Sequence, residues 1–290
     1  KKMSNDLNEK NKVAGWSVMA AVFLTGFKLI VGLVTGSLGI LSEALHSALD
    51  LVAAVITWFA VRFSDRPADE NHQYGHGKIE NLSALIETAL LLITCAWIIY
   101  EAVQRLTTGN THIEVTVWSY IVVVSSIVID FSRSRALSRV AKKHNSQALE
   151  ADALHFSTDI WSSSVVLLGL ICANFGFHLA DSVAALGVAV IVIFVSVKLG
   201  KKAIDALLDR SPEKMNQQIA ELIRQSDEVV SFHDLKVRNA GADYFVDVTI
   251  HVNPGLSVVE AHRISHKVEK LICSKINRCE VQVHYEPDGE

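Results

Sequence analysis

Residues 41–61, LSEALHSALDLVAAVITWFAV, form an apolar run long enough to cross a membrane, yet they contain His46 and Asp50. The same His-x-x-x-Asp spacing returns at His155 and Asp159, inside a second apolar run. An ionisable side chain in hydrocarbon costs roughly 3 kcal/mol or more. Four such groups at matched spacing therefore predict a shared partner, and a metal ion is the simplest one.

Apolar runs of about 20 residues predict six membrane helices. They lie near 13–34, 38–63, 80–104, 114–136, 152–174 and 179–200. The second and fifth are the weakest by hydropathy, because they carry the His and Asp pairs. The first run is too long for the core of a cleaved signal peptide and leads into another apolar run, so we interpret it as a true span.

The composition indicates that part of the chain is soluble. Half of the 290 residues are hydrophobic, mean hydropathy is +0.30, and 20% are charged, which is high for a chain that lies entirely in a membrane. We therefore expect a membrane domain at 1–210 and a second domain at 211–290. The net charge of −4, without a basic tract, does not indicate a nucleic-acid partner.

Charge at the joints between spans predicts the orientation. Joints after the second, fourth and sixth spans carry the Lys and Arg residues: Arg62, Arg66, Arg133, Arg135, Arg139, Lys142, Lys143, Lys198, Lys201 and Lys202. The other joints hold only Arg105, and 174–179 holds no Lys or Arg. The positive-inside rule then places both termini in the cytoplasm.

The C-terminal part reads as an α-β-β-α-β module. We expect a helix over 213–226, strands over 231–238 and 243–253, a helix near 257–275 and a strand near 279–286. Alternation in the second strand predicts a core face and a face available to a partner or ligands. Cys95, Cys172, Cys273 and Cys279 show no disulfide or zinc-ribbon spacing, so we expect reduced, structural cysteines.

Residues four apart on a helix share a face, so each His-x-x-x-Asp pair projects together. If the second and fifth spans pack side by side, His46, Asp50, His155 and Asp159 can close tetrahedrally around one divalent ion, and Zn2+ suits that set. A lone membrane His more often bonds to a neighbouring helix, and a lone Asp can be a proton relay. Two copies of one spacing favour the metal.

Two further clusters carry ligand-type side chains. Asp69, His72 and His76 lie in one polar loop, where they could bend onto an ion or only be solvated. The second cluster is in the C-terminal module, where the alternative is a polar surface with scattered histidines. Its candidate residues are His233, His251, His262, His266, His284 and Glu286.

On these residues the chain resembles the cation diffusion facilitators, proton-coupled exporters of zinc and related divalent metals. The likeness covers essentially the whole length, and the loop PADENHQYGHGK at 67–78 is very similar to the bacterial ferrous-iron and zinc efflux branch. It implies an α-helical membrane protein with six transmembrane helices and a cytoplasmic, ferredoxin-like α+β domain that resembles metallochaperones. It also implies a homodimer in a cell membrane, in bacteria the inner membrane.

The resemblance also implies roles for individual residues. The membrane quartet would be the transport site, and Asp69, His72 and His76 a loop site. His233, His262, His284 and Glu286 would belong to a two-metal site between two C-terminal domains, and Lys78 and Asp209 to a charge interlock of the dimer.

Two departures from the family pattern matter. His46 replaces an Asp of the close bacterial relatives, which favours Zn2+ over Mn2+. The family's strand histidine falls at Thr249, so either His251 substitutes for it or the site has fewer ligands.

We therefore expect a Zn2+/H+ antiporter working by alternating access, with Fe2+, Co2+ or Cd2+ as further cargo. Zn2+ would be both the cargo and a structural or regulatory ion, and no organic cofactor is expected. An exporter selective for Fe2+ or Mn2+ and a membrane metal sensor stay open as alternatives. An intramembrane metalloenzyme would be expected to carry His-Glu-x-x-His, which this sequence lacks.

Overall fold

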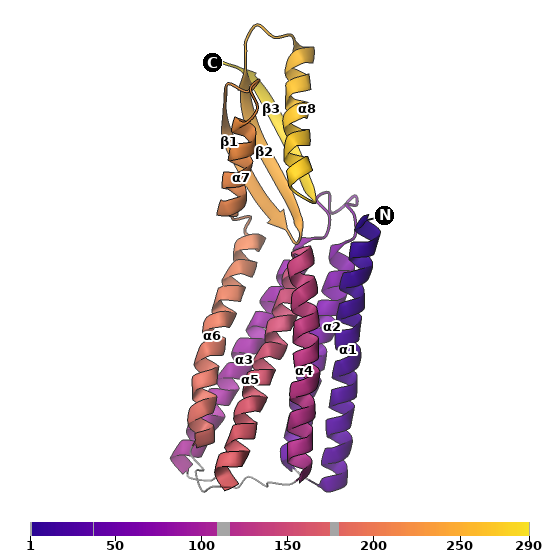
Figure 1. The fold of residues 1–290 in the computed structure, drawn as a ribbon, viewed down its shortest axis with the longest axis vertical. Coiled ribbons are helices and arrows are strands. Elements are labelled where there is room, and N and C mark those ends of the chain that lie inside the picture. Colours follow the sequence, from indigo (N-terminus) through magenta and orange to yellow (C-terminus); the bar gives the residue numbers. More distant parts are fainter. Residues whose placement is uncertain (1, 37, 109–116, 175–179, 290) are drawn as a thin grey trace. The chain divides into compact units, whose positions relative to one another are not determined.

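The computed structural model describes residues 2–36, 38–108, 117–174 and 180–289, in which six long helices precede a small α+β unit (Figure 1). The chain divides into two compact units, Lys1–Ile204 and Asp205–Glu290. The six helices are α1 (Lys2–Thr35), α2 (Leu38–Ser64), α3 (Lys78–Thr108), α4 (Val117–His144), α5 (Gln147–Asn174) and α6 (Ala180–Leu207).

Each helix covers one predicted span, but several helices are longer than the span. Helix α1 begins well before residue 13, and α4 continues beyond residue 136 because Leu137, Val140 and Ala141 keep an apolar, buried face. The predicted joint at 174–179 and the side chain of Cys172 lie outside the described residues. Cys95, Cys273 and Cys279 are free thiols.

Four helices are long and apolar enough to cross a membrane by length and composition. These segments are Asn8–Thr35, Glu43–Ser64, Lys78–Gln104 and Val117–His144. Within the described residues, α5 and α6 do not reach this criterion. Among these four segments, mean hydropathy is 1.7 in α2 and 1.3 in α4, so the prediction that the second span is one of the two weakest is wrong.

Small side chains bring the helices of the membrane unit together. One buried cluster joins α1, α2, α4 and α5 mainly through alanines such as Ala14, Ala54 and Ala148, and it includes the fully buried Phe156. Small residues let helix backbones approach closely in a bilayer. At Gly32 a Cβ atom would lie 2.8 Å from Leu41 Cδ2 and 3.2 Å from the Leu41 backbone nitrogen, so α1 and α2 approach closely there.

Two buried cations of the membrane unit, Lys28 and Arg133, pair with carboxylates. Lys28 Nζ lies 3.1 Å from Glu43 Oε2, and Arg133 Nη1 lies 3.2 Å from Asp130 Oδ1. Asp130 thus pairs with an arginine one turn further along its own helix, and Lys28 of α1 pairs with Glu43 of α2. Both pairs neutralise charge inside the membrane unit.

The second unit has the predicted α-β-β-α-β order. Its elements are α7 (Glu213–Arg224), β1 (Ser231–Ala240), β2 (Asp243–Val252), α8 (Val258–Lys275) and β3 (Cys279–Pro287). Strand β2 is central, antiparallel to β1 and parallel to β3. The face of β2 that carries Val246, Val248 and Ile250 is buried under α7 and α8, so the other face of the sheet is left for ligands.

Candidate metal centres

The two His-x-x-x-Asp pairs of α2 and α5 come together in the structure. His155 Nε2 lies 3.0 Å from Asp50 Oδ1 and 3.7 Å from Asp159 Oδ2. His46 Nε2 lies 3.9 Å from Asp50 Oδ1 and 3.8 Å from Asp159 Oδ1. Each imidazole thus faces both carboxylates, one from its own helix and one from the other.

The surroundings of this quartet suit a cation. Asp50, His155 and Asp159 are buried, whereas the side chain of His46 is 36% exposed. The ligand atoms of His46, Asp50 and Asp159 lie within 4.8 Å of one another, and His155 completes the set through its contacts with both carboxylates. Two neutral imidazoles and two carboxylates give four ligands and two negative charges, which balance one divalent ion.

The loop residues Asp69, His72 and His76 also converge. Their ligand atoms lie within 4.8 Å of one another; His72 Nδ1 is 3.2 Å and His76 Nε2 is 3.3 Å from the Asp69 carboxylate. Gly75 makes this turn possible, because its φ of +75° is a conformation that other residues rarely adopt, and its N–H donates to the His72 carbonyl.

Backbone hydrogen bonds stabilise the ionised form of Asp69. The N–H groups of His72 and Asn71 donate to Asp69 Oδ1, and these bonds lower the pKa of the carboxyl below its usual range. Because its pKa is lowered, the Asp69 carboxyl is ionised at any pH above the ordinary Asp range. It takes up a proton only when the pH falls through the lowered pKa. The loop therefore holds a carboxylate ready for a cation at acidic pH.

Zn2+ binding at the loop is expected to weaken as the pH falls, because protons compete with Zn2+ for the imidazole nitrogens while the lowered pKa of Asp69 keeps its carboxylate charged. His72→Ala should lower the loop affinity at least roughly tenfold, since it removes one of three ligands. Calorimetric Zn2+ titration in an Asp50→Ala/Asp159→Ala background measures this, with Glu70→Gln as the control. An affinity that stays constant down to about pH 5 would show that the imidazoles do not bind.

In the second unit, strand register places the ligand-type residues in two rows on the open face of the sheet. His233, Thr249 and His284 form one row, and His251 and Glu286 pair in the next. His251 Nε2 lies 2.9 Å from His233 Nδ1, and these two with Glu286 bring ligand atoms within 4.8 Å. His284 Nε2 lies 3.4 Å from Glu286 Oε1.

Two predictions from the family resemblance concern His262 as a ligand beside the strand residues and the pairing of Lys78 with Asp209. His262 lies on α8, which covers the core face of the sheet, so it does not join the strand ligands within one chain; its ring instead contacts His266 at 4.6 Å between centroids. Lys78 opens α3 in the first unit, and Asp209, 3.8 Å from Arg238, belongs to the second. The interlock between Lys78 and Asp209 stays a prediction.

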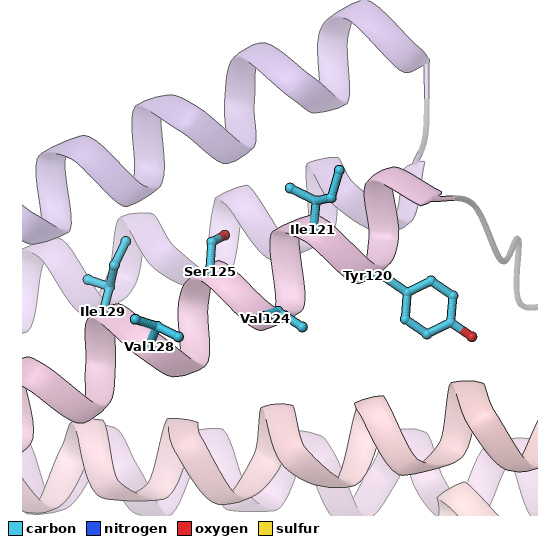
Figure 2. A pocket seen from close by; sticks show the side chains of 6 residues that line it. All are labelled: Tyr120, Ile121, Val124, Ser125, Val128 and Ile129. Carbon is cyan, nitrogen blue, oxygen red and sulfur yellow. The ribbon is translucent and has the colours of Figure 1, made fainter.

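A hollow of about 530 Å3 along α4 offers no metal ligands (Figure 2). Its lining comes from one helix and consists of Tyr120, Ile121, Val124, Ser125, Val128 and Ile129. The side chains are almost entirely apolar, as expected for a helix face in contact with lipid. The candidate sites are therefore the three His and Asp or Glu clusters.

Two family models match the chain, one to each part. The cation efflux transmembrane domain matches residues 16–208, and the cytoplasmic domain of cation efflux proteins matches residues 211–288. The chain belongs to the cation efflux family. It is therefore a multi-pass membrane transporter with six helices and a cytoplasmic α+β domain, not an enzyme, and the predicted family and fold class are confirmed.

Curated members of the cation efflux family align over most of the chain. The cation-efflux pump FieF of Citrobacter koseri is 30% identical over 276 residues, which are 93% of this chain and 90% of that protein. FieF of Cronobacter sakazakii is 30% identical over 272 residues with the same coverage. The solved metal-bound C-terminal domain of the CzcD transporter from Thermotoga maritima is 28% identical, covering 27% of this chain and 91% of that chain, with a TM-score of 0.26.

Membership of the cation efflux family makes a metal cation the transported species. The cytoplasmic domain model is that of the family's dimerisation domain, so this part of the chain mediates dimerisation. Sequence reasoning found the membrane quartet by its spacing and the other two clusters by the density of His, Asp and Glu residues in one loop and in the C-terminal module. It missed the buried acids Glu80, Glu87 and Asp152, because single carboxylates in a helix carry no local pattern.

Proposed function

We propose that this member of the family exports Zn2+ from the cytoplasm in exchange for protons, with His46, Asp50, His155 and Asp159 as the transport site. The observation that carries the proposal is the mutual approach of two imidazoles and two carboxylates, from two helices, within 4 Å inside the membrane unit. Two nitrogen and two oxygen ligands suit Zn2+ better than harder ions such as Mn2+.

The same ligands supply the coupling to protons. A metal binds only deprotonated ligands, so Zn2+ and protons compete for the same lone pairs of the imidazoles and carboxylates. Facing the cytoplasm, the quartet takes up Zn2+ and releases protons; facing the other side, incoming protons displace Zn2+. Alternating access of this kind exchanges one Zn2+ for one or more protons.

The cytoplasmic domain would bind metal at the contact between two copies of the chain. His233, His251 and Glu286 already approach one another, which supports His251 as the substitute for the histidine that the family pattern expects at Thr249. His262, on the other side of the sheet, would reach such a site from the second copy. Metal there would tighten the homodimer, with Lys78 and Asp209 as its interlock, in the bacterial inner membrane.

The direct test is Zn2+ flux into proteoliposomes that contain the purified protein, with and without a pH gradient. The proposal expects flux that follows the gradient and is fastest for Zn2+ among Zn2+, Fe2+, Co2+ and Mn2+. Faster flux of Fe2+ or Mn2+ than of Zn2+ would show that one of those ions, and not Zn2+, is the preferred cargo. Zn2+ binding without flux of any ion would contradict export and support a membrane metal sensor.

His46→Asp is expected to lower the ratio of Zn2+ to Mn2+ transport by roughly an order of magnitude, because it replaces a nitrogen ligand with a hard oxygen ligand. The ratio of initial flux rates in the two ions measures this effect. Leu45→Ala is the matched control, since Leu45 is adjacent and 69% exposed. An unchanged ratio in His46→Asp would show that His46 does not contact the transported ion.

A further inference from the structure

Two cysteines from different elements of the cytoplasmic domain are in contact. Cys273 lies in the last turn of α8, and Cys279 is the first residue of β3. The Cys273 thiol donates a hydrogen bond to the main-chain oxygen of Cys279, with 3.3 Å between sulfur and oxygen. The Cys279 side chain branches from the Cα atom next to that carbonyl carbon, so rotation of the two side chains can bring their sulfur atoms together.

The two thiols differ in their surroundings. Cys273 is exposed, whereas Cys279 is half-buried against the core of the domain. Burial, followed by the charge and the hydrogen bond of the neighbouring Cys273 thiol, raises the pKa of Cys279 to about 12. Cys279 therefore stays a thiol at neutral pH, and Cys273 is the sulfur that a small molecule in solution reaches first.

The chain between the two cysteines is held in place by the rest of the domain. Ile276, which caps α8, is buried in the core, and its N–H donates to the carbonyl of Ile272. Arg278 donates through Nε and Nη2 to the two carboxylate oxygens of Asp243 at 2.6 and 2.8 Å, and its carbonyl accepts from the N–H of Tyr244. These contacts keep the end of α8 beside the start of β3, so the two thiols stay close in the folded domain.

The cysteine pair is separate from the metal-ligand cluster on the open face of the sheet. Cys279 pairs with Tyr244 at one end of β2, whereas Glu286 pairs with His251 near the other end. The distance along β3 from Cys279 to Glu286 is roughly 23 Å, at about 3.3 Å for each residue of a strand. Within the described ranges, neither cysteine belongs to a group of three ligand-type side chains. The pair is therefore suited to sulfur–sulfur chemistry.

We propose that Cys273 and Cys279 form a reversible redox site, which closes to a disulfide within one chain when small-molecule disulfides accumulate in the cytoplasm. Disulfides in the cytoplasm are usually transient and redox-sensing, because thiol reductants keep other cysteines reduced. The free thiols of the structure are then the resting form of the site. The two cysteines are six positions apart and form no C-x-x-C pattern, so only the packing of α8 and β3 reveals the pair.

The oxidant is a low-molecular-weight disulfide, and the reaction consists of two thiol–disulfide exchanges. Cys273 loses its proton and its thiolate attacks one sulfur of the small disulfide, whose S–S bond breaks as one small thiolate leaves. In this mixed disulfide Cys273 carries no charge, which removes one cause of the raised pKa of Cys279. Cys279 then loses its proton and attacks Cys273 Sγ, and the second small thiolate leaves. The small thiolates take up the two protons; the protein has lost two electrons and the small disulfide has gained them.

The test uses the full-length protein in detergent, with Cys95→Ala and Cys172→Ala so that only the pair remains. Glutathione buffers with an increasing oxidised fraction are applied, and free thiols and intact mass are then measured. Both thiols should be lost together, with a mass lower by two hydrogen atoms, no attached glutathione and no cross-link between chains. Dithiothreitol should restore both thiols. Peptide mapping of the oxidised parent should find the same disulfide, which makes the result independent of the two alanine substitutions.

A matched control moves one thiol around the same turn of α8. Cys273→Ser combined with Ser274→Cys keeps an exposed thiol on the helix but turns it by about 100°. Ser274 Oγ donates to the carbonyl of Leu271 within α8. This variant should accumulate a mixed disulfide with glutathione. The oxidised Cys273–Cys279 protein should also unfold at a higher temperature than its reduced form, because a cross-link restricts the unfolded chain.

Several outcomes of this experiment would overturn the redox site. Thiols that stay free, or that carry only glutathione in the most oxidising buffer, would show that the two sulfur atoms do not meet. A disulfide between two chains would make the site an intermolecular one. Equal closure in the control would mean that the position of Cys273 has no special role. Protection of both thiols by one equivalent of Cd2+ or Zn2+, without disulfide formation, would assign the pair to metal binding.

Discussion

Asp159→Ala and Asp50→Ala are each expected to abolish Zn2+ transport, with initial flux reduced at least about 100-fold. Changes in groups that only orient a metal ligand already cost 10- to 100-fold in affinity, roughly, so loss of a direct ligand should cost at least as much. Each substitution also leaves the remaining imidazoles without the carboxylate that they face at 3.0 to 3.9 Å. Proteoliposome flux and Zn2+ titration measure the two consequences.

Leu49→Ala is the matched control for this experiment. Leu49 precedes Asp50 on α2 and is 58% exposed, so its truncation changes the same turn without touching the quartet. It should transport at nearly the parent rate. Flux that survives both Asp substitutions would place the transport site elsewhere and refute the quartet.

The spacing of the quartet residues predicts their arrangement because it is a local property repeated on two helices. An i,i+4 pair shares a helix face whatever the rest of the chain does. Spacing alone does not predict which helix packs beside α2. In the structure that helix is α5, because His155 Nε2 lies 3.0 Å from Asp50 Oδ1. That these four side chains bind a metal stays a prediction.

The cytoplasmic domain is predicted in more detail, because strand alternation determines both its core and its open face. Val246, Val248 and Ile250 are buried as their alternation predicts, and His251 lies on the other face with His233 and Glu286. Its order of elements could be read from the sequence for the same reason. The position of His262 relative to the sheet could not be read from the sequence, because helix packing decides which face of the sheet α8 covers.

Long-range polar contacts inside the membrane unit are not predictable from local pattern. Ser17 and Asp152 are 135 positions apart, and Lys10 and Glu80 are 70 apart. Lys10 reads as part of a polar leader before the first span. In the structure α1 begins at Lys2, which carries Lys10 into the helix and buries it.

Lys10 joins α1 to the ends of three other helices. Its Nζ lies 2.5 Å from Asp65 Oδ2, just after α2, and 3.0 Å from Glu80 Oε1 in the first turn of α3. Ser64 Oγ donates to Glu80 at 3.1 Å, and Ser146 Oγ, just before α5, donates to its other oxygen. A buried ion pair of this kind is strongly destabilised when one partner is removed, because an unpaired charge is left inside the protein.

Lys10→Met should therefore destabilise the membrane unit by about 3–5 kcal/mol, observed as a lower thermal unfolding midpoint in detergent. Lys12→Met is the control, because Lys12 is exposed two positions away and should change the midpoint little. Adding Glu80→Met to Lys10→Met removes part of the uncompensated charge, so the double variant should be more stable than the sum of the single effects predicts. Additive losses would mean that Lys10 and Glu80 do not interact. The coupling matters for the loop site as well, since Asp65 and Glu80 flank Asp69, His72 and His76 and hold the two ends of that loop to α1.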